Sequence, residues 1–200
     1  MYVPPAFAVE DALPLLRTAD SGDLVTSTAD GLLATLLPWT WSDDAGALQG
    51  HLARANPQWR TPALGPALVL LRWHEAYVSP SWYAAKREHG RVVPTWDYVQ
   101  VQVTGRLVVH EDPAWLADQV DRLTARHEQR RAEPWAVTDA PAPWVAGQLR
   151  GIVGVEVVPE RVEAKAKLSQ NRSAADVAGV VAGLRADGLH DVADAVQALL

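Results

Sequence analysis

The sequence predicts an α+β fold in which about six strands form a sheet that closes into a small barrel, with helices around it. Two observations predict this class. Segments with strand-like alternation, or with short apolar runs, recur along the chain and are interspersed with segments of helical periodicity. Apolar residues make up 48% of the 200 residues, which is enough to build the core of one substantial domain.

The N-terminal segments predict a short helix followed by a hairpin. Residues 10–19 have helical spacing, and Pro14 is tolerated there because it falls in the first turn. Residues 23–28 and 32–39 are strand-like. The Asp-Gly pair between them supplies the positive φ angles that a tight turn requires.

The central segments alternate between strands and helices. Asn56 is placed to cap a helix whose first turn holds Pro57, and Gly90 is placed to end another. Gly105 indicates a bend or bulge in a long half-buried strand. In chain order the segments are a strand at 47–53, a short helix at 56–64, a strand at 66–78, a helix at 79–90 and a strand at 95–111.

Residues 113–200 are predicted to contain four helices and, between the second and third of them, a strand region. A helix begins at Pro113 and continues to about residue 131, and a short one covers 143–150. Residues 151–168 read as two strands that turn near Pro159. Beyond Ser173, which fits a capping box, a helix continues until Gly188 breaks it. The inward-facing residues of the final helix are Leu189, Val192, Val196 and Leu199.

Composition excludes several classes of protein. A net charge of −6 argues against an extended nucleic-acid surface, because such surfaces depend on clustered Lys and Arg. With no cysteine, disulfides, thiolate metal sites and cysteine nucleophiles are impossible. No apolar run approaches the roughly 20 residues of a membrane span. The N-terminus lacks the pattern of an export signal, so we expect a cytoplasmic protein.

Common catalytic motifs are also missing. The sequence contains no GxSxG, no GxxxxGK[ST] and no GxGxxG, which counts against a nucleophile-elbow hydrolase, a P-loop and a Rossmann fingerprint. The six histidines are scattered, so spacing gives no support for a metal centre.

The first candidate cluster is GHLARANPQW, residues 50–59. His51, Arg54, Asn56 and Gln58 lie where a strand ends and a helix begins, and backbone amides at such a junction favour an anion. The planar fork of Arg54 suits phosphate. The alternative is that Asn56-Pro57 is an ordinary helix cap.

Two further clusters, VSPSWY at 78–83 and VPTWDY at 93–98, set a hydroxyl beside tryptophan and tyrosine. Hydroxyls can bond the rim of a heteroaromatic ring while aromatic faces pack against it. The chain has nine tryptophans and one phenylalanine, which favours either a flat aromatic ligand or tryptophan in phenylalanine's place in the core. For the two clusters themselves, capping by Ser79 or Ser81 and a turn at Pro94 are the alternatives.

The fourth cluster is KLSQN, residues 167–171, at the end of a strand. Its lysine, hydroxyl and amides can bond a carbonyl, a ribityl hydroxyl or a phosphate. The alternative is a solvated turn that leads to the helix at Ser173.

Taken in order, GHLARANPQW, AYVSPSWY, VPTWDYVQVQVTGRL, GIVGVEV and KLSQNRS resemble the motif series of the PaiB-like family, which is also described as FMN-binding negative transcriptional regulators. The resemblance runs from MYVPPAF to about Ser173. It implies an FMN-binding split β-barrel related to pyridoxamine 5′-phosphate oxidases and flavin reductases, and a homodimer with flavin at the subunit interface.

The resemblance divides the chain into a split-barrel FMN-binding domain at 1–172 and a C-terminal helical extension at 173–200, packed on the same domain or on the dimer interface. The residues that it places at the phosphate and ribityl end of FMN are Thr35, His51, Arg54 and Asn56. Those that it places around the flavin ring are Trp59, Ser81, Trp82, Tyr83 and Trp96. Those placed at other flavin polar atoms are Lys167, Ser169, Gln170 and Asn171.

One departure concerns redox tuning. Where the family pattern has an amide in Thr-Trp-Asn-Tyr, this chain has Asp97. An ionised carboxylate accepts hydrogen bonds and donates none. If Asp97 faced the ring, it would disfavour negative charge on the reduced flavin.

Three functions follow in order of preference: an FMN-dependent oxidoreductase or flavin reductase, a non-catalytic FMN-binding regulator or sensor, and a haem-binding split barrel with His51 or His74 as the iron ligand. Direct DNA binding is not expected of the C-terminal segment. Residues 173–200 carry one arginine and four aspartates, whereas a recognition helix requires positive charge.

Overall fold

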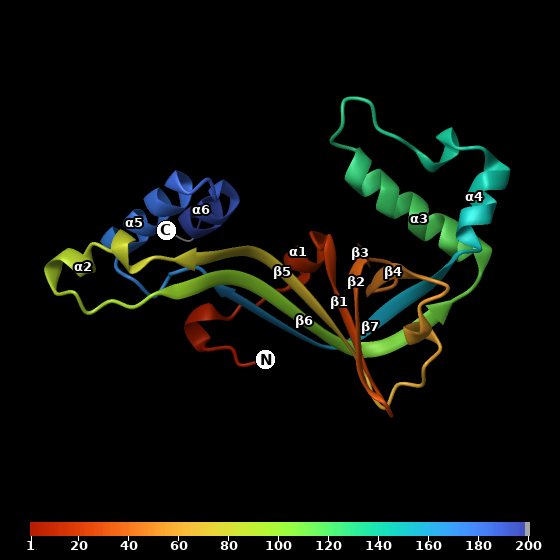
Figure 1. Ribbon diagram of the computed structural model, residues 1–200, viewed down its shortest axis with the longest axis horizontal. Helices are drawn as coiled ribbons and strands as arrows, with labels where there is room; N and C mark the ends of the chain where they lie inside the picture. Colours follow the sequence, from red (N-terminus) through yellow and green to blue (C-terminus); the bar gives the residue numbers. More distant parts are fainter. Residues whose placement is uncertain (199–200) are drawn as a thin grey trace. The chain divides into compact units, whose positions relative to one another are not determined.

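The computed structural model describes residues 1–198 and shows an α+β fold built on a seven-stranded sheet with the order β2-β1-β5-β6-β7-β4-β3 (Figure 1). The predicted fold class is confirmed, and the three-residue β3 is a strand that the sequence did not predict. The strands are β1 (Ser21–Thr28), β2 (Gly31–Pro38), β3 (Thr40–Ser42), β4 (Ala47–Ala53), β5 (Ala67–Val78), β6 (Thr95–His110) and β7 (Ile152–Lys167).

The helices of the described residues are mostly short. The α-helices are α1 (Leu13–Arg17), α2 (Ala85–Glu88), α3 (Pro113–Glu128), α4 (Ala142–Leu149), α5 (Ala174–Ala186) and α6 (His190–Gln197). The 3₁₀ turns are η1 (Pro5–Phe7), η2 (Pro57–Trp59), η3 (Pro80–Trp82) and η4 (Val137–Asp139). Within residues 1–198, no helix combines the length and the apolar character that crossing a bilayer requires.

The chain forms two compact units. The first contains Met1–Ala12, Arg72–Val101 and the chain from Glu163 on, and the second contains Leu13–Leu71 and Gln102–Val162. The strands β5, β6 and β7 each contribute residues to both units. The domain boundary expected at residue 172 follows from the extent of the family resemblance and not from the compactness of the structure. It stays a prediction.

The second unit contains the predicted hairpin and the curled part of the sheet. In the β1–β2 pair Thr28 lies opposite Gly31, whose φ of +119° only glycine adopts readily. The turn is therefore confirmed, although Gly31 alone supplies the positive φ. The strand β2 also contacts β4, which is near the other end of the strand order, so the sheet curls as barrel closure requires.

The core of this curl is centred on Trp39. Its ring is completely buried, and Nε1 donates to the carbonyl of Gly22 at 3.1 Å. A side chain on Gly50 would come within 3.2 Å of the ring and 2.8 Å of the Pro38 carbonyl oxygen. This tryptophan is therefore in the core, as the phenylalanine-replacement interpretation predicts.

The prediction of two strands turning near Pro159 is wrong, because β7 continues through this residue. The neighbouring strand β6 is also continuous, and Gly105 lies where a Cβ would clash with the backbone of Val158. Glycine on one strand thus lets the proline-containing backbone of the other approach closely.

Three predicted helices are shorter than expected. The segment 79–90 splits into η3 and α2, because Tyr83 between them is extended, with φ −71° and ψ 133°. The segment 56–64 contains only η2, which Asn56 caps. The first helix is likewise reduced to α1, with Pro14 in its first turn.

The C-terminal helical pair is confirmed. Ser173 Oγ accepts from the Asp176 amide and caps α5, and Gly188, with φ +79°, separates α5 from α6. The two helices lie side by side (Figure 1). The inward residues of the final helix include Val192 and Val196, whereas Leu199 lies outside the described residues.

Candidate functional site

Thr35 and Asn56 meet in a hydrogen-bonded group around the buried Gln58. Asn56 Nδ2 donates to Thr35 Oγ1 at 3.0 Å, and that hydroxyl donates to Gln58 Oε1 at 2.6 Å. Gln58 Nε2 donates in turn to the Leu24 carbonyl at 3.0 Å. Much of the hydrogen-bonding capacity is used within the chain. One lone pair on the Thr35 oxygen and one amide hydrogen of Asn56 remain for a ligand.

Arg54 is held by three hydrogen bonds at the end of β4. Its Nε donates to the Arg150 carbonyl at 2.9 Å, one terminal nitrogen to the Ile152 carbonyl at 3.1 Å, and the other to Glu111 Oε1 at 2.6 Å. Two of its five N–H groups remain free for an anion. A cavity of about 280 Å³ adjoins it, lined by Arg54, Glu111, Leu149 and Arg150 among others. Because Glu111 balances Arg54, Arg150 leaves the cavity with net positive charge.

Trp59 belongs to the same arrangement. Its Nε1 donates to the Arg54 carbonyl at 3.0 Å, and the guanidinium groups of Arg54 and Arg60 lie 5.8 and 4.7 Å from the ring centroid. Such cation–π contacts fix the ring and the guanidinium groups relative to each other. Trp59 thus helps to orient the arginine beside the cavity.

His51 is oriented by a fully buried glutamine on α3. Its Nδ1 lies 2.9 Å from Oε1 of Gln119, and because an amide oxygen only accepts, this contact assigns the proton to Nδ1 and the lone pair to Nε2 in the neutral ring. The neutral tautomer therefore presents an acceptor on the ring edge away from Gln119.

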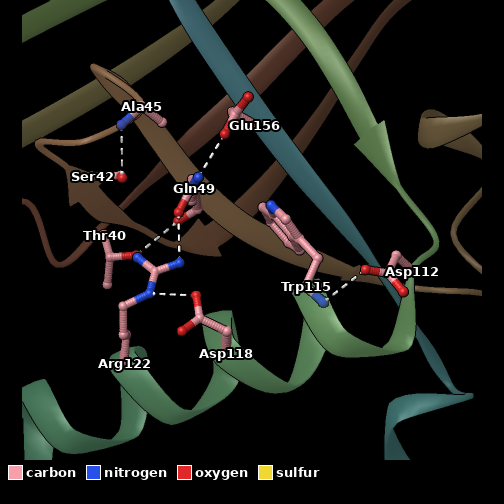
Figure 2. A network of polar contacts seen from close by, with 9 residues as sticks. All are labelled: Thr40, Ser42, Ala45, Gln49, Asp112, Trp115, Asp118, Arg122 and Glu156. Carbon is pink, nitrogen blue, oxygen red and sulfur yellow. Dashed lines mark hydrogen bonds and ion pairs between the residues drawn. The ribbon is translucent and has the colours of Figure 1, made fainter.

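A second set of contacts fixes α3 against the sheet and thereby positions Gln119 (Figure 2). Gln49, two residues before His51 on β4, accepts from Arg122 at 2.7 Å and donates to Glu156 on β7 at 2.6 Å. Arg122 is three residues after Gln119 and so shares its helix face. The alternation of β4 and the periodicity of α3 together aim His51 and Gln119 at each other.

Lys167, in the first unit, closes the end of β7 onto the beginning of β6. Its ammonium group donates to the Thr95 hydroxyl and to the Trp96 carbonyl, and it lies 3.7 Å from Asp97 Oδ1. The lysine thus fixes the backbone beside Trp96.

Asp97 is completely buried, with Ser169 as its partner. Ser169 Oγ donates to Oδ2 at 2.7 Å, and Ser169 adopts a left-handed φ of +61°. Burial raises the pKa of Asp97, whereas the Ser169 hydrogen bond and the Lys167 charge act in the opposite direction. Asp97 and Trp96 point to opposite faces of β6, because strand neighbours alternate. The carboxylate therefore does not share the face of Trp96.

The remaining members of the fourth cluster differ in availability. Gln170 closes its own turn, since Oε1 accepts from the Leu168 amide at 2.7 Å and Nε2 donates to the Ala166 carbonyl at 2.5 Å. Asn171 is exposed. Gln170 thus fits the alternative interpretation of this cluster as a turn before the helix at Ser173, while the side chain of Asn171 is accessible to a ligand.

Ser81, Trp82 and Tyr83 all make contacts within the first unit, although Ser81 is exposed and only Tyr83 is buried. Ser81 Oγ accepts from Lys86 at 3.1 Å, and Ser79 is the residue that caps η3. The indole of Trp82 lies against α5, and Tyr83 is buried with the Arg172 guanidinium 4.8 Å from its ring. Burial raises the pKa of the Tyr83 hydroxyl.

Trp96 is the most accessible aromatic of the predicted set, with 50% of its surface exposed. It lies 6.4 Å from Tyr77, centroid to centroid, and lines a cavity of about 280 Å³ with Arg72, Glu75, Tyr98 and Gln100. This cavity combines an open indole face with polar side chains.

The predicted site residues fall into two groups. Those of the second unit are Thr35, His51, Arg54, Asn56 and Trp59. Those of the first unit are Ser81, Trp82, Tyr83, Trp96, Lys167, Ser169, Gln170 and Asn171. Thr35 bonds Asn56, and Arg54 contacts Trp59, whereas Lys167 is joined to Ser169 through Asp97.

Sequence reasoning missed Glu111 and Gln119 as partners, because nothing local indicates a contact between residues so far apart in the chain. A signal did exist for Asp97. Val99 and Val101 share its strand parity, and this predicts that it points into the core.

Comparison with known proteins identifies the family. Residues 1–161 match the model of a family described as "Putative FMN-binding domain". The protease synthase and sporulation protein PAI 2 of Bacillus subtilis is 34% identical over 191 residues, which cover 92% of this chain and 89% of that protein. The chain belongs to this FMN-binding domain family. The PaiB-like resemblance is confirmed, and FMN is the cofactor in the family's description.

Solved structures of other proteins show the same fold. A conserved hypothetical protein of Mycobacterium tuberculosis superimposes with a TM-score of 0.59 at 15% identity, over 86% of this chain and 94% of that one. The FAD and haem binding protein of Mycobacterium smegmatis gives 0.57 at 18% identity, over 80% and 72%. At these identities the likeness concerns the fold alone.

Proposed function

We propose that this FMN-binding domain uses its cofactor for electron transfer, as an FMN-dependent oxidoreductase or flavin reductase. The observation that carries the proposal is the family match over residues 1–161. When bound, FMN supplies the redox chemistry, and the protein supplies binding, orientation and electrostatics. A chain with ligand-binding clusters and without a common catalytic motif suits this division.

The side chains suit the parts of FMN to different degrees. Arg54 keeps two free N–H groups beside a cavity that Arg150 makes positive, which suits the phosphate. Thr35 and Asn56 keep one acceptor and one donor, which suits ribityl hydroxyls. In the first unit, Trp96 and Asn171 are predicted members whose side chains stay accessible to a ligand.

Other members of the predicted set act in this proposal by positioning their neighbours. Lys167 fixes the backbone at Trp96, Ser169 holds Asp97, and Trp59 orients Arg54. Four members support the local structure through contacts within the first unit, and they are Ser81, Trp82, Tyr83 and Gln170. We place His51 beside the ligand through its free Nε2. The homodimer and the cytoplasmic location are likewise proposals, which rest on the sequence.

A second candidate is an FMN-binding regulator without turnover. The name of the Bacillus subtilis relative, a protease synthase and sporulation protein, favours it. Haem ranks third, with Nε2 of His51 as the nitrogen available to iron.

The first test is the absorption spectrum of the purified full-length chain after incubation with FMN, or with haemin, and desalting. We expect a retained two-banded flavin spectrum that NADH or NADPH bleaches. Retention without bleaching by either donor would favour the regulator, and a Soret band without flavin would favour haem.

The second step of this test measures FMN affinity by fluorescence quenching. Arg54→Ala should weaken binding about tenfold or more, because a charge-assisted hydrogen bond is worth roughly 1.5–3 kcal/mol. Lys167→Ala should weaken it less. Arg17→Ala removes another surface arginine of the same unit, which is paired with Asp43, and should change nothing. Unchanged affinity in both test variants would refute the polar-site assignments.

A further inference from the structure

A second cavity of the second unit, of about 290 Å³, lies among β4, α3, η4 and α4. Its walls include His51, Trp135, Val137, Trp144 and Leu149. None of the side chains that line it in the described part of the chain is charged. Leu149 also lines the cavity at Arg54, so the two cavities adjoin, one neutral and aromatic and the other positive.

The two tryptophans of this cavity are unusually open. Trp135 is 46% exposed and Trp144 is 56% exposed. They belong to a stretch, residues 129–150, in which no residue is buried, although α4 is rich in apolar side chains. Large apolar side chains gathered around a concavity are typical of a ligand site, whereas core tryptophans such as Trp39 are fully enclosed.

His51 and Gln148 are polar side chains among those that line the cavity, and His51 is the one whose orientation a buried partner fixes. Gln119 holds its Nδ1–H, so Nε2 is the nitrogen left to accept a hydrogen bond. A neutral imidazole acceptor beside apolar walls selects a ligand that carries an N–H or O–H donor and no charge at this position.

We propose that this cavity binds a planar aromatic ring whose edge donates an N–H or O–H hydrogen bond to Nε2 of His51, with Trp135 and Trp144 as its walls. Two sources share this chemistry. One is the ring of FMN, with its phosphate at the neighbouring Arg54 cavity, in which case the inference rests on the proposed function. The other is a separate phenolic or N–H heteroaromatic substrate.

The probe is 2-naphthol, titrated calorimetrically into the flavin-free full-length chain, with 2-methoxynaphthalene as the ligand that lacks the donor. We expect 2-naphthol to bind about tenfold more tightly than its methyl ether, which corresponds to one hydrogen bond. Trp144→Ala should weaken 2-naphthol binding about tenfold. Leu64→Ala removes an exposed apolar side chain of the same unit that does not line the cavity, and should have no effect.

Three results would overturn the proposal: absence of 2-naphthol binding, equal affinity for the two probes, or weakening by Trp96→Ala and not by Trp144→Ala. Trp96 is a similarly exposed tryptophan, and it lines the cavity of the first unit. Its variant therefore separates a general affinity for aromatic compounds from binding at His51.

Competition then identifies the source. Displacement of 2-naphthol by both FMN and riboflavin would assign the cavity to the flavin ring, whereas simultaneous binding would assign it to a separate aromatic substrate. A chain that retains FMN and binds no 2-naphthol would refute this inference alone. A chain that binds 2-naphthol and retains no FMN would refute the proposed function alone.

Discussion

The helices α5 and α4, one in each unit, contain similar residues. They differ in how closely a tryptophan packs on their glycines. In α5, Gly179 and Gly183 leave room for the backbone and indole of Trp82, which a Cβ at either position would meet. In α4, a Cβ on Gly147 would come no closer than 3.7 Å to another residue, and Trp144 is exposed. The glycines of α5 thus receive the indole of Trp82, whereas no side chain of the described residues packs closely on Gly147 of α4 and Trp144 stays accessible to a ligand.

The two ion pairs of the predicted site differ in the same way. Lys167 faces Asp97, which is completely buried, whereas Arg54 faces Glu111, which is 56% exposed. A surface pair is screened by water and contributes little to stability, while a buried carboxyl depends on its partners. In the first unit, the cluster of Lys167 and Asp97 therefore holds the strands together. In the second unit, Arg54 remains partly available to a ligand.

The largest effect expected from this contrast is that of Asp97→Ala. It would remove the acceptor of the buried Ser169 hydroxyl and the carboxylate beside the Lys167 ammonium, at a cost of about 3 kcal/mol in the free energy of unfolding. Glu111→Ala is the matched variant in the second unit, and it should cost less than about 1 kcal/mol. Urea unfolding measures both. Equal shifts of the two midpoints would mean that burial does not distinguish the pairs.

The next effect comes from the helical glycines. Gly179→Ala should destabilise the protein by about 2 kcal/mol, because its Cβ meets the Trp82 backbone, which cannot rotate away. The Cβ of Gly147→Ala would meet only the end of the Arg150 side chain, at 3.7 Å, and the substitution should stabilise α4 by roughly 0.5–1 kcal/mol through helix propensity. Thermal unfolding of both variants distinguishes them. A stabilising Gly179→Ala would show that η3 can move off α5.

Local signals in the sequence were sufficient for several elements. The Asp-Gly turn gave the hairpin because Gly31 takes a φ that few residues accept, and Ser173 marked the beginning of α5 because its hydroxyl caps the helix. Tertiary packing overrode local signals elsewhere. Pro159 suggested a turn, but the strand continues where Gly105 allows close approach. Tyr83 interrupts a helical pattern where its ring is buried in the core.

The candidate site was predictable as a set of clusters and not as a set of contacts. Donor-rich motifs located Arg54 and Lys167, but their partners Glu111 and Thr95 lie 57 and 72 residues away along the chain. Only the fold decides how many donors such partners consume. The cavity at His51 was missed for a similar reason, since Trp135 and Trp144 lie in a loop-rich stretch outside the resemblance motifs.

The smallest predicted effect is a pH dependence of the free energy of unfolding. It shows whether burial or the partners Ser169 and Lys167 dominate the pKa of Asp97. Because burial raises the pKa of this carboxyl above its ordinary value of 3.8, the folded protein holds the proton more tightly than the unfolded chain. The resulting stability is present at low pH and is lost as pH rises through the folded pKa. The stability of the wild type relative to Asp97→Asn should therefore fall as pH rises from about 4 towards neutrality. Urea midpoints of both proteins across this range measure the slope. A rise instead would mean that Ser169 and Lys167 outweigh burial, and that the cluster of the first unit is held by charge pairing.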